Sequence, residues 1–288
     1  MNKAPVGLWY IHISALTVAG TGVFARSINL PAYQLIAWRA LFASLVLFIF
    51  IKLFKKTQKM SIQEWSWIIV LGMATCFHWV TFFHAMQISG VAVGMLSLFT
   101  FPVMIVLFEP IINKTAFHKK DLVAAFAVFG GIALMIPELD LDNQTTQGVF
   151  WGVISAFVWS FRNIYFKKKL SHLPSDQSMM WQLVVVAILL LPLSSPDVFE
   201  VSNNDWFLLV ALALFCTALP HTLLLASMKT LSAKTSGLIA CLQPVYGTIF
   251  AIFILSEAPN WQTVVGGVFI IGASVFESLS VINQSRAR

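Results

Sequence analysis

Long apolar segments constrain the fold of this chain more than any other feature. A helix needs about 20 apolar residues to cross the hydrocarbon core of a bilayer. The runs do not alternate apolar with polar residues, as the strands of a membrane β-barrel would. We therefore expect an all-α integral membrane protein with ten transmembrane helices. The ten runs lie roughly at residues 6–25, 32–54, 65–87, 91–112, 121–137, 147–167, 176–194, 205–227, 235–256 and 260–282.

The composition argues against soluble proteins. Of the 288 residues, 58% are hydrophobic and 10% are charged, whereas soluble proteins carry about 25% charged residues. A soluble domain of this size exposes too much surface to hide so many apolar side chains. Lys3 precedes the first run, but no small-residue cleavage site follows, so we expect this span to remain in the mature protein.

Basic residues predict the orientation. If the N-terminus is cytoplasmic, fifteen of the 18 Lys and Arg residues lie in inside segments and Arg26 alone lies in an outside loop. Such a bias follows the positive-inside rule. We expect a multi-pass protein of the cell inner (cytoplasmic) membrane with both termini cytoplasmic. The net charge of +6 then reflects the inner membrane face and does not indicate a nucleic acid partner.

The chain repeats itself at a long interval. The pattern Pro-x-x-Gln-x-x-x-Trp at 31–38 recurs at 174–181, a shift of 143 residues. Pro102 and Pro244 lie 142 residues apart, and two Gly-Gly pairs open similar stretches at 130–131 and 266–267. These ordered matches predict two halves, residues 1–140 and 145–288, with five spans each.

Five spans in each half would turn the second half upside down relative to the first. The loop at 52–59 is basic, while its counterpart after the seventh span is acidic, with Asp197, Glu200 and Asp205. Equivalent loops of opposite charge are expected if they face opposite sides of the membrane. A 5+5 inverted repeat is typical of secondary transporters, which bind substrate near the midplane between the halves.

Four motifs resemble a known family. They lie at 38–43 (Trp-Arg-Ala-Leu-Phe-Ala), at 92–102, at 152–168 and at 242–244, where Leu-Gln-Pro is followed by Glu257. With them the chain resembles the drug/metabolite transporter superfamily, in particular its EamA-type ten-span members. The resemblance implies transport of amino acids and other small metabolites, often as efflux. The chain departs from the family pattern at two positions. Ala19 or Gly20 stands where the family has Trp, and Thr115 stands where the first half of family members has Glu.

Prolines and charges inside spans are candidates for transport roles. Pro102 and Pro244 free backbone carbonyls and bend a helix, which predicts a cavity wall that can flex or a static packing kink. Arg162 could bind a substrate carboxylate or extend toward the cytoplasmic end of its span. For Arg39 we favour a structural role, extended outward or paired with a carbonyl. Two acids could carry a coupled proton or be solvated helix ends: Glu109 and Glu277.

Aromatic and imidazole side chains complete the predicted site. His78 and Trp79 lie at a similar depth to His221, because Trp79 and His221 are equivalent in the repeat at a shift of 142 residues. Trp159 is mid-span, where an interfacial role fits badly, and could stack a substrate. The predicted substrate-binding residues are His78, Trp79, Phe99, Trp159, Arg162, His221 and Gln243.

These features predict a secondary active transporter of a small organic metabolite, and the family resemblance implies an amino acid or related compound moved outward. The alternative is an importer of an organic cation such as a quaternary amine. No nucleotide-binding loop, zinc-protease motif or nucleophile elbow is present in the sequence, so we expect no enzyme, cofactor or metal. Protons remain a possible partner, and three scattered cysteines are expected to be packed thiols.

Overall fold

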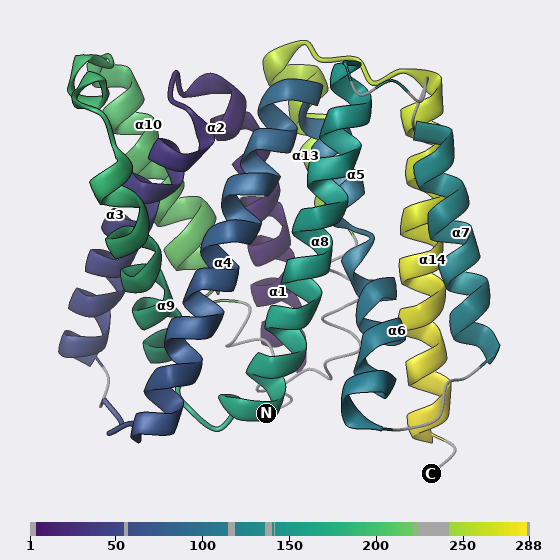
Figure 1. Cartoon of the computed structure of the whole chain (residues 1–288), viewed down its shortest axis with the longest axis horizontal. Coiled ribbons are helices and arrows are strands. Elements are labelled where there is room, and N and C mark those ends of the chain that lie inside the picture. Colours follow the sequence, from purple (N-terminus) through teal and green to yellow (C-terminus); the bar gives the residue numbers. More distant parts are fainter. Residues whose placement is uncertain are drawn as a thin grey trace.

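Helices make up nearly all the regular structure (Figure 1). A computed structural model describes residues 4–54, 57–114, 119–135, 140, 142–221, 223 and 242–286, and within these ranges no β-strand occurs. The elements are α1 Ala4–Ala19, α2 Thr21–Ser27, α3 Ala32–Phe54, α4 Ile62–Ser89, α5 Val91–Leu98, α6 Phe101–Asn113, α7 Lys119–Met135, α8 Gln144–Lys169, α9 Ser175–Leu190, η1 Leu191–Leu193, η2 Pro196–Glu200, α10 Asn203–Ala213, η3 Leu214–Ala218, α13 Gln243–Leu255 and α14 Trp261–Arg286.

Each of the ten predicted apolar runs overlaps at least one described helix. Large apolar side chains point outward from these helices, as lipid contact requires: Phe126 is 75% exposed and Phe253 82%. The membrane-spanning helical fold is therefore confirmed, while the number of crossings stays a prediction. Among the described residues, six stretches are long and apolar enough to cross a membrane: Gly7–Ser27, Ala32–Phe54, Ile62–Ser89, Val91–Asn113, Asp176–Leu193 and Asn203–His221.

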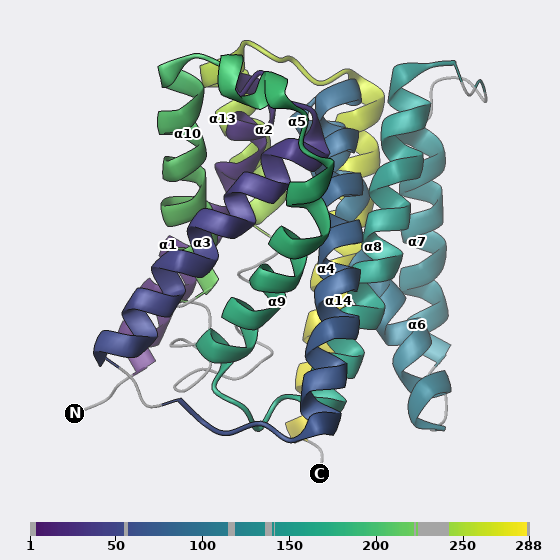
Figure 2. The same ribbon diagram turned by 60° about the vertical axis from the view of Figure 1, so that its left-hand side comes forward.

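The helices stand roughly side by side and define two ends of the molecule. In Figure 1, α1 begins and α14 ends at the lower end, while α2 and the connection from α13 to α14 lie at the upper end. The principal packed pairs are α4 with α8, α7 with α14 and α3 with α9. Figure 1 shows α3 and α9 on the left, α14 and α7 on the right and α4 and α8 between them, and Figure 2 shows α7 beyond α8 on the side away from α9.

One glycine from each repeated Gly-Gly pair lies at the contact between α7 and α14. A Cβ on Gly131 of α7 would lie 2.7 Å from the carbonyl oxygen of Gly266 on α14, and a Cβ on Gly266 would lie 2.5 Å from that of Gly131. No larger residue fits there without moving one backbone. Small residues at such positions let membrane helices approach closely, where packing rather than the hydrophobic effect holds them together.

Equivalent residues of the repeat make reciprocal contacts across the halves. Gln34 Nε2 of α3 donates to Ser195 Oγ, just after α9, at 3.0 Å. Gln177 Nε2 of α9 donates to the carbonyl oxygen of Gln58, just after α3, at 2.7 Å. Contacts exchanged in this way are expected when two halves are related by a twofold axis.

The repeated tryptophans behave in the same way. Trp38 of α3 packs edge-on against Trp206 of α10 at 4.9 Å between ring centroids. Trp181 of α9 packs edge-on against Trp65 of α4 at 4.8 Å. Each tryptophan thus contacts a helix of the other predicted half. This arrangement is the one expected if the two predicted halves are structurally equivalent.

Helix breaks lie where the sequence predicted bends. α5 ends at Leu98 and α6 begins at Phe101, so Pro102 stands in the first turn of a new helix. Pro244 likewise stands in the first turn of α13. Proline is favoured there because its missing N–H would lack a helical partner anyway. The bend expected at Pro102 is thus a complete interruption of the helix. Ala240, whose carbonyl Pro244 was expected to free, lies outside the described residues.

Candidate functional site

His78 of α4 joins two helices in the interior. The residue is 3% exposed, and its Nδ1 lies 2.7 Å from Ser155 Oγ of α8. Its ring stacks on that of Trp159, also on α8, with 4.3 Å between centroids. The repeat places His78 in the first half and Trp159 in the second, so this stack crosses the boundary between the halves.

Arg162 also lies against the Trp159 ring. Its Cζ lies 4.7 Å from the Trp159 ring centroid, a cation–π distance. Gln182 Oε1 of α9 accepts from Nε at 3.2 Å and from Nη2 at 2.9 Å. Asn163 Oδ1 accepts from Nη1 at 3.1 Å. The side chain is 9% exposed and bonds to Gln182 instead of extending toward Lys167–Lys169 at the end of α8.

Trp79, next to His78 on α4, faces a second arginine. The Cζ atom of Arg39 on α3 lies 4.2 Å from the Trp79 ring centroid. Arg39 Nε donates to Thr217 Oγ1 at 2.6 Å. His221 lies 6.5 Å from Trp79 between ring centroids, and its Nδ1 contacts the Thr217 carbonyl oxygen at 2.6 Å.

These side chains form one cluster. His78 and Trp79 are adjacent in sequence, and both guanidinium groups act electrostatically on both histidines. Neither arginine forms an ion pair among the residues that the structure describes. We call this group the two-arginine cluster: Arg39, His78, Trp79, Trp159, Arg162 and His221.

Five of the seven predicted substrate-binding residues belong to this cluster. Of the other two, Phe99 lies at the break between α5 and α6 and packs in a separate apolar cluster with Met135 and Ile270. Gln243 is the first residue of α13. Their assignment came from motifs, which fix a position in the sequence but not the direction of a side chain.

Arg39, for which the sequence favours a structural role, also belongs to the cluster. The expected carbonyl contact exists, since Nη2 donates to the Cys216 carbonyl oxygen at 3.4 Å. Cys216 and Thr217 lie in η3, a π-helical turn, a form that often marks functional positions. In the sequence, the one indication that Arg39 is functional is its charge inside an apolar run.

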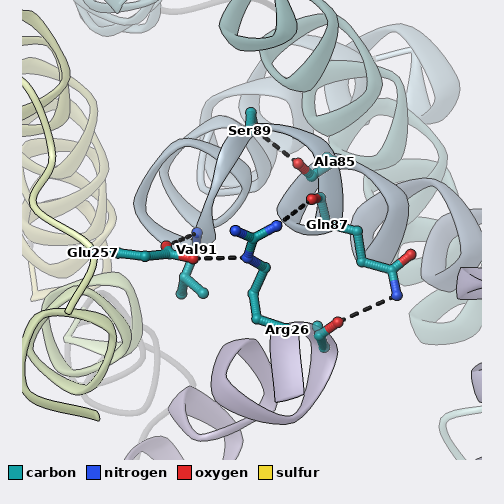
Figure 3. Close-up of polar contacts among 7 residues, drawn as sticks. Arg26, Ala85, Gln87, Ser89, Val91 and Glu257 are labelled. Atoms are coloured by element: carbon teal, nitrogen blue, oxygen red, sulfur yellow. Dashed lines mark hydrogen bonds and ion pairs between the residues drawn. The ribbon is translucent and has the colours of Figure 1, made fainter. Parts of the chain in front are cut away.

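The upper end is tied by a carboxylate from the second half (Figure 3). Glu257, between α13 and α14, accepts from Arg26 Nε at 2.7 Å through Oε1 and from the Val91 backbone N–H at 2.9 Å through Oε2. Arg26 lies in the last turn of α2, and Val91 is the first residue of α5. Arg26 also donates to the Gln87 carbonyl oxygen at the end of α4. One carboxylate therefore connects three elements of the first half to the second.

The lower end is bridged less tightly. Lys167 Nζ of α8 lies 3.4 Å from Glu109 Oε1 of α6, with side chains 77% and 35% exposed. Glu64 of α4 also pairs with His172, which follows α8. Glu109 is thus ion-paired at a helix end, and a proton-coupling role for it stays a prediction. The side chain of Glu277 lies outside the described residues.

A surface hollow between α7 and α14 is distinct from this cluster. It is lined only by apolar residues and glycine, and Val123 and Val268 on its walls are 62% and 66% exposed. It therefore faces the lipid. Cys76 and Cys216 are buried free thiols, as expected, while Cys241 lies outside the described residues.

Apolar helices around a buried cationic and aromatic cluster define a helical membrane transporter. The model of the EamA-like transporter family matches the chain twice, over residues 5–136 and 146–279. The chain therefore belongs to the EamA-like transporter family, within the drug/metabolite transporter superfamily.

Relatives and a solved structure agree with this assignment. An uncharacterized transporter, YxxF, of Bacillus subtilis is 23% identical over 90% of this chain and 85% of its own. An S-adenosylmethionine uptake transporter of Rickettsia felis is 21% identical over 94% of this chain and 91% of its own. A crystal structure aligns with a TM-score of 0.67 over 97% of this chain and 99% of its own, at 16% identity, which supports the fold alone.

Proposed function

We propose that this chain is a secondary active transporter that moves a small organic metabolite, an amino acid or related compound, by alternating access. In this proposal ten spans form a 5+5 inverted repeat, with halves at residues 1–140 and 145–288. The reciprocal contacts of Gln34 and Gln177 support this layout. So does the double match of the family model, over 5–136 and 146–279.

The positive-inside bias supports an inner-membrane protein whose termini are cytoplasmic. With that orientation, the upper end carries Arg26 and Glu257 and faces outward. The lower end carries Lys167–Lys169, at the end of α8, and faces the cytoplasm. Alternating access then requires the Arg26–Glu257 tie to break for outward opening, and the Lys167–Glu109 bridge to break for inward opening.

The observation that carries the proposal is the two-arginine cluster. Its members come from both halves: Arg39, His78 and Trp79 from the first, and Trp159, Arg162 and His221 from the second. Charged side chains inside a membrane protein are expensive and mark substrate or ion pathways. A site shared by both halves is also what rocking of one half against the other requires.

The cluster favours an amino acid over an organic cation. Aromatic faces alone would hold a quaternary amine, but two guanidinium groups beside them repel a positive charge. The Rickettsia relative is named for uptake of S-adenosylmethionine, which is an α-amino acid and also carries a positive sulfonium group, so this name does not discriminate between the two candidates. The outward direction that we propose rests on the family resemblance, and uptake is the alternative.

Counterflow in proteoliposomes tests the function. Vesicles that contain the purified full chain are loaded with an unlabelled amino acid, S-adenosylmethionine or choline, and accumulation of the same labelled compound is followed. We expect transient accumulation of an amino acid or S-adenosylmethionine, and none of choline. Chemically unchanged compound recovered from the vesicles separates a carrier from an enzyme. Accumulation of choline alone would favour the organic cation importer, and no accumulation of any compound would contradict the proposal.

A tryptophan pair provides the matched control. Trp159→Ala removes the ring that stacks on His78 and Arg162. Trp9→Ala makes the same chemical change at a side chain that is 70% exposed. Loss of aromatic and cation–π contacts of about 1–2 kcal/mol predicts about 5- to 30-fold weaker apparent affinity for Trp159→Ala only. Equal effects of the two substitutions on apparent affinity would contradict a role of Trp159 in substrate binding.

A further inference from the structure

Arg39 is a buried cation with an unused donor. The residue is 3% exposed. Nε donates to Thr217 Oγ1 at 2.6 Å and Nη2 to the Cys216 carbonyl oxygen at 3.4 Å. Nη1 is buried and has no hydrogen-bond partner among the residues that the structure describes. The π-helical turn thus binds Nε and Nη2 of the guanidinium, and Nη1 remains available to donate a hydrogen bond.

Arg162 provides the internal comparison. All three of its guanidinium nitrogens have acceptors, from Gln182 and Asn163. Those acceptors are neutral amide oxygens that fix its position. Of the two buried arginines, Arg39 is therefore the one that is held in place and still has a donor to offer.

An unpaired N–H on a buried cation is unfavourable, because the group has lost water and gained nothing in return. In the part of the chain that the structure describes, no carboxylate forms an ion pair with Arg39. Few buried donors in folded proteins stay unpaired, and one in a transport protein points to a partner that is not part of the chain. The missing partner is an anion.

The surroundings of Arg39 restrict the shape of that anion. Trp79 and Phe83 of α4 lie against the guanidinium, with Cζ at 4.2 Å and 5.0 Å from their ring centroids. The group can therefore be reached through its nitrogens at the edge of the plane. A planar carboxylate matches donors arranged along such an edge.

We infer that Arg39 selects the substrate through its carboxylate, by donating from Nη1 to a carboxylate oxygen while the aromatic side chains of the two-arginine cluster contact the rest of the molecule. This inference rests on the proposed function and deepens it, because it names the group that the site recognises. It makes Arg39 a specificity-determining residue and assigns Arg162 to positioning Trp159. Substrates that lack the carboxylate are then rejected even when their apolar part is unchanged.

Matched ligand pairs test the inference. The purified full chain is titrated with L-methionine against methioninamide, L-tryptophan against tryptophanamide, and S-adenosylmethionine against its decarboxylated form, with thermal stabilisation as the readout. We expect each acid that binds to do so about 10- to 100-fold more tightly than its partner, the usual effect of removing a charge-assisted hydrogen bond. Arg39→Met should abolish this preference. Lys52→Met, which removes an exposed cation from the same helix, should leave it intact.

Arg39→Lys keeps the charge but not the fork of donors, and should retain only part of the preference for the acid. This variant also carries the test if Arg39→Met does not fold. Binding of the amide as tightly as the acid, an unchanged preference in Arg39→Lys and Arg39→Met, or binding of no acid at all would overturn the inference. Counterflow of a compound without acid selectivity would overturn the inference alone and leave the transport function standing.

Discussion

Replacing Glu257 by Gln should loosen the upper end of the molecule. The substitution keeps the shape of the side chain but removes the charge that pairs with Arg26 at 2.7 Å. The single amide oxygen can still accept from the Val91 N–H, but the NH₂ group then faces the Arg26 Nε donor, so the substitution removes the charge and one hydrogen bond. The tie crosses from the second half to the first, so its loss should change the balance between closed and open states of that end.

The magnitude follows from the exposure of the two groups. The Arg26 and Glu257 side chains are 39% and 22% exposed, and a partly exposed ion pair contributes about 0.2–1 kcal/mol. The negative charge at the N-terminus of α5 adds about 0.3–1 kcal/mol by interaction with the helix dipole. Together they amount to about 0.5–2 kcal/mol, which corresponds to an increase of about 2- to 30-fold in the population open at the upper end.

Double electron–electron resonance measures this change. Spin labels at Ser27 and Ala258, both exposed, span the tie, and labels at Lys59 and Ser171 report on the lower end. In Glu257→Gln the upper distances should lengthen, while the lower ones do not.

Glu109→Gln, which breaks the Lys167 bridge, is the control with the opposite expectation. An Arg26→Glu, Glu257→Arg double substitution should restore part of the closed population. Distance distributions unchanged by Glu257→Gln would refute the role of the tie.

Three further predictions concern stability, each measured as the free energy of unfolding in detergent. Gly131→Ala should destabilise the chain by about 1–3 kcal/mol because its Cβ would overlap the α14 backbone, whereas Gly130→Ala, with nothing within 4 Å, should not; equal values would contradict the packing of α7 on α14. Gln182→Leu should cost about 3 kcal/mol, because it removes the acceptor of two bonds from buried Arg162; wild-type stability would show that Arg162 has other acceptors. Ser202→Ala removes the N-cap of α10 and should cost about 1 kcal/mol, and no change would indicate that water replaces the cap.

The repeat could be predicted from the sequence because the matching residues have roles in the backbone or at the membrane interface. Pro31 and Pro174 precede helices, and Trp38 and Trp181 pack near the ends of spans. Such roles depend on local position, so they recur at one interval along the chain. The same holds for His78, Trp79 and His221, whose shared depth follows from counting residues along equivalent spans.

The locations of the apolar segments were determined by the sequence, because the length of an apolar run is a local property that must match the thickness of the hydrocarbon core. The relation between Arg39 and Arg162 was decided by tertiary structure alone. Both are cations inside apolar runs. The packing of α8 and α9 on α4 brings Gln182 to Arg162, whereas Nη1 of Arg39 has no acceptor among the described residues. The Arg26–Glu257 tie joins residues 231 positions apart, and Phe99 faces Met135 and Ile270, because side-chain direction depends on which distant helix packs alongside.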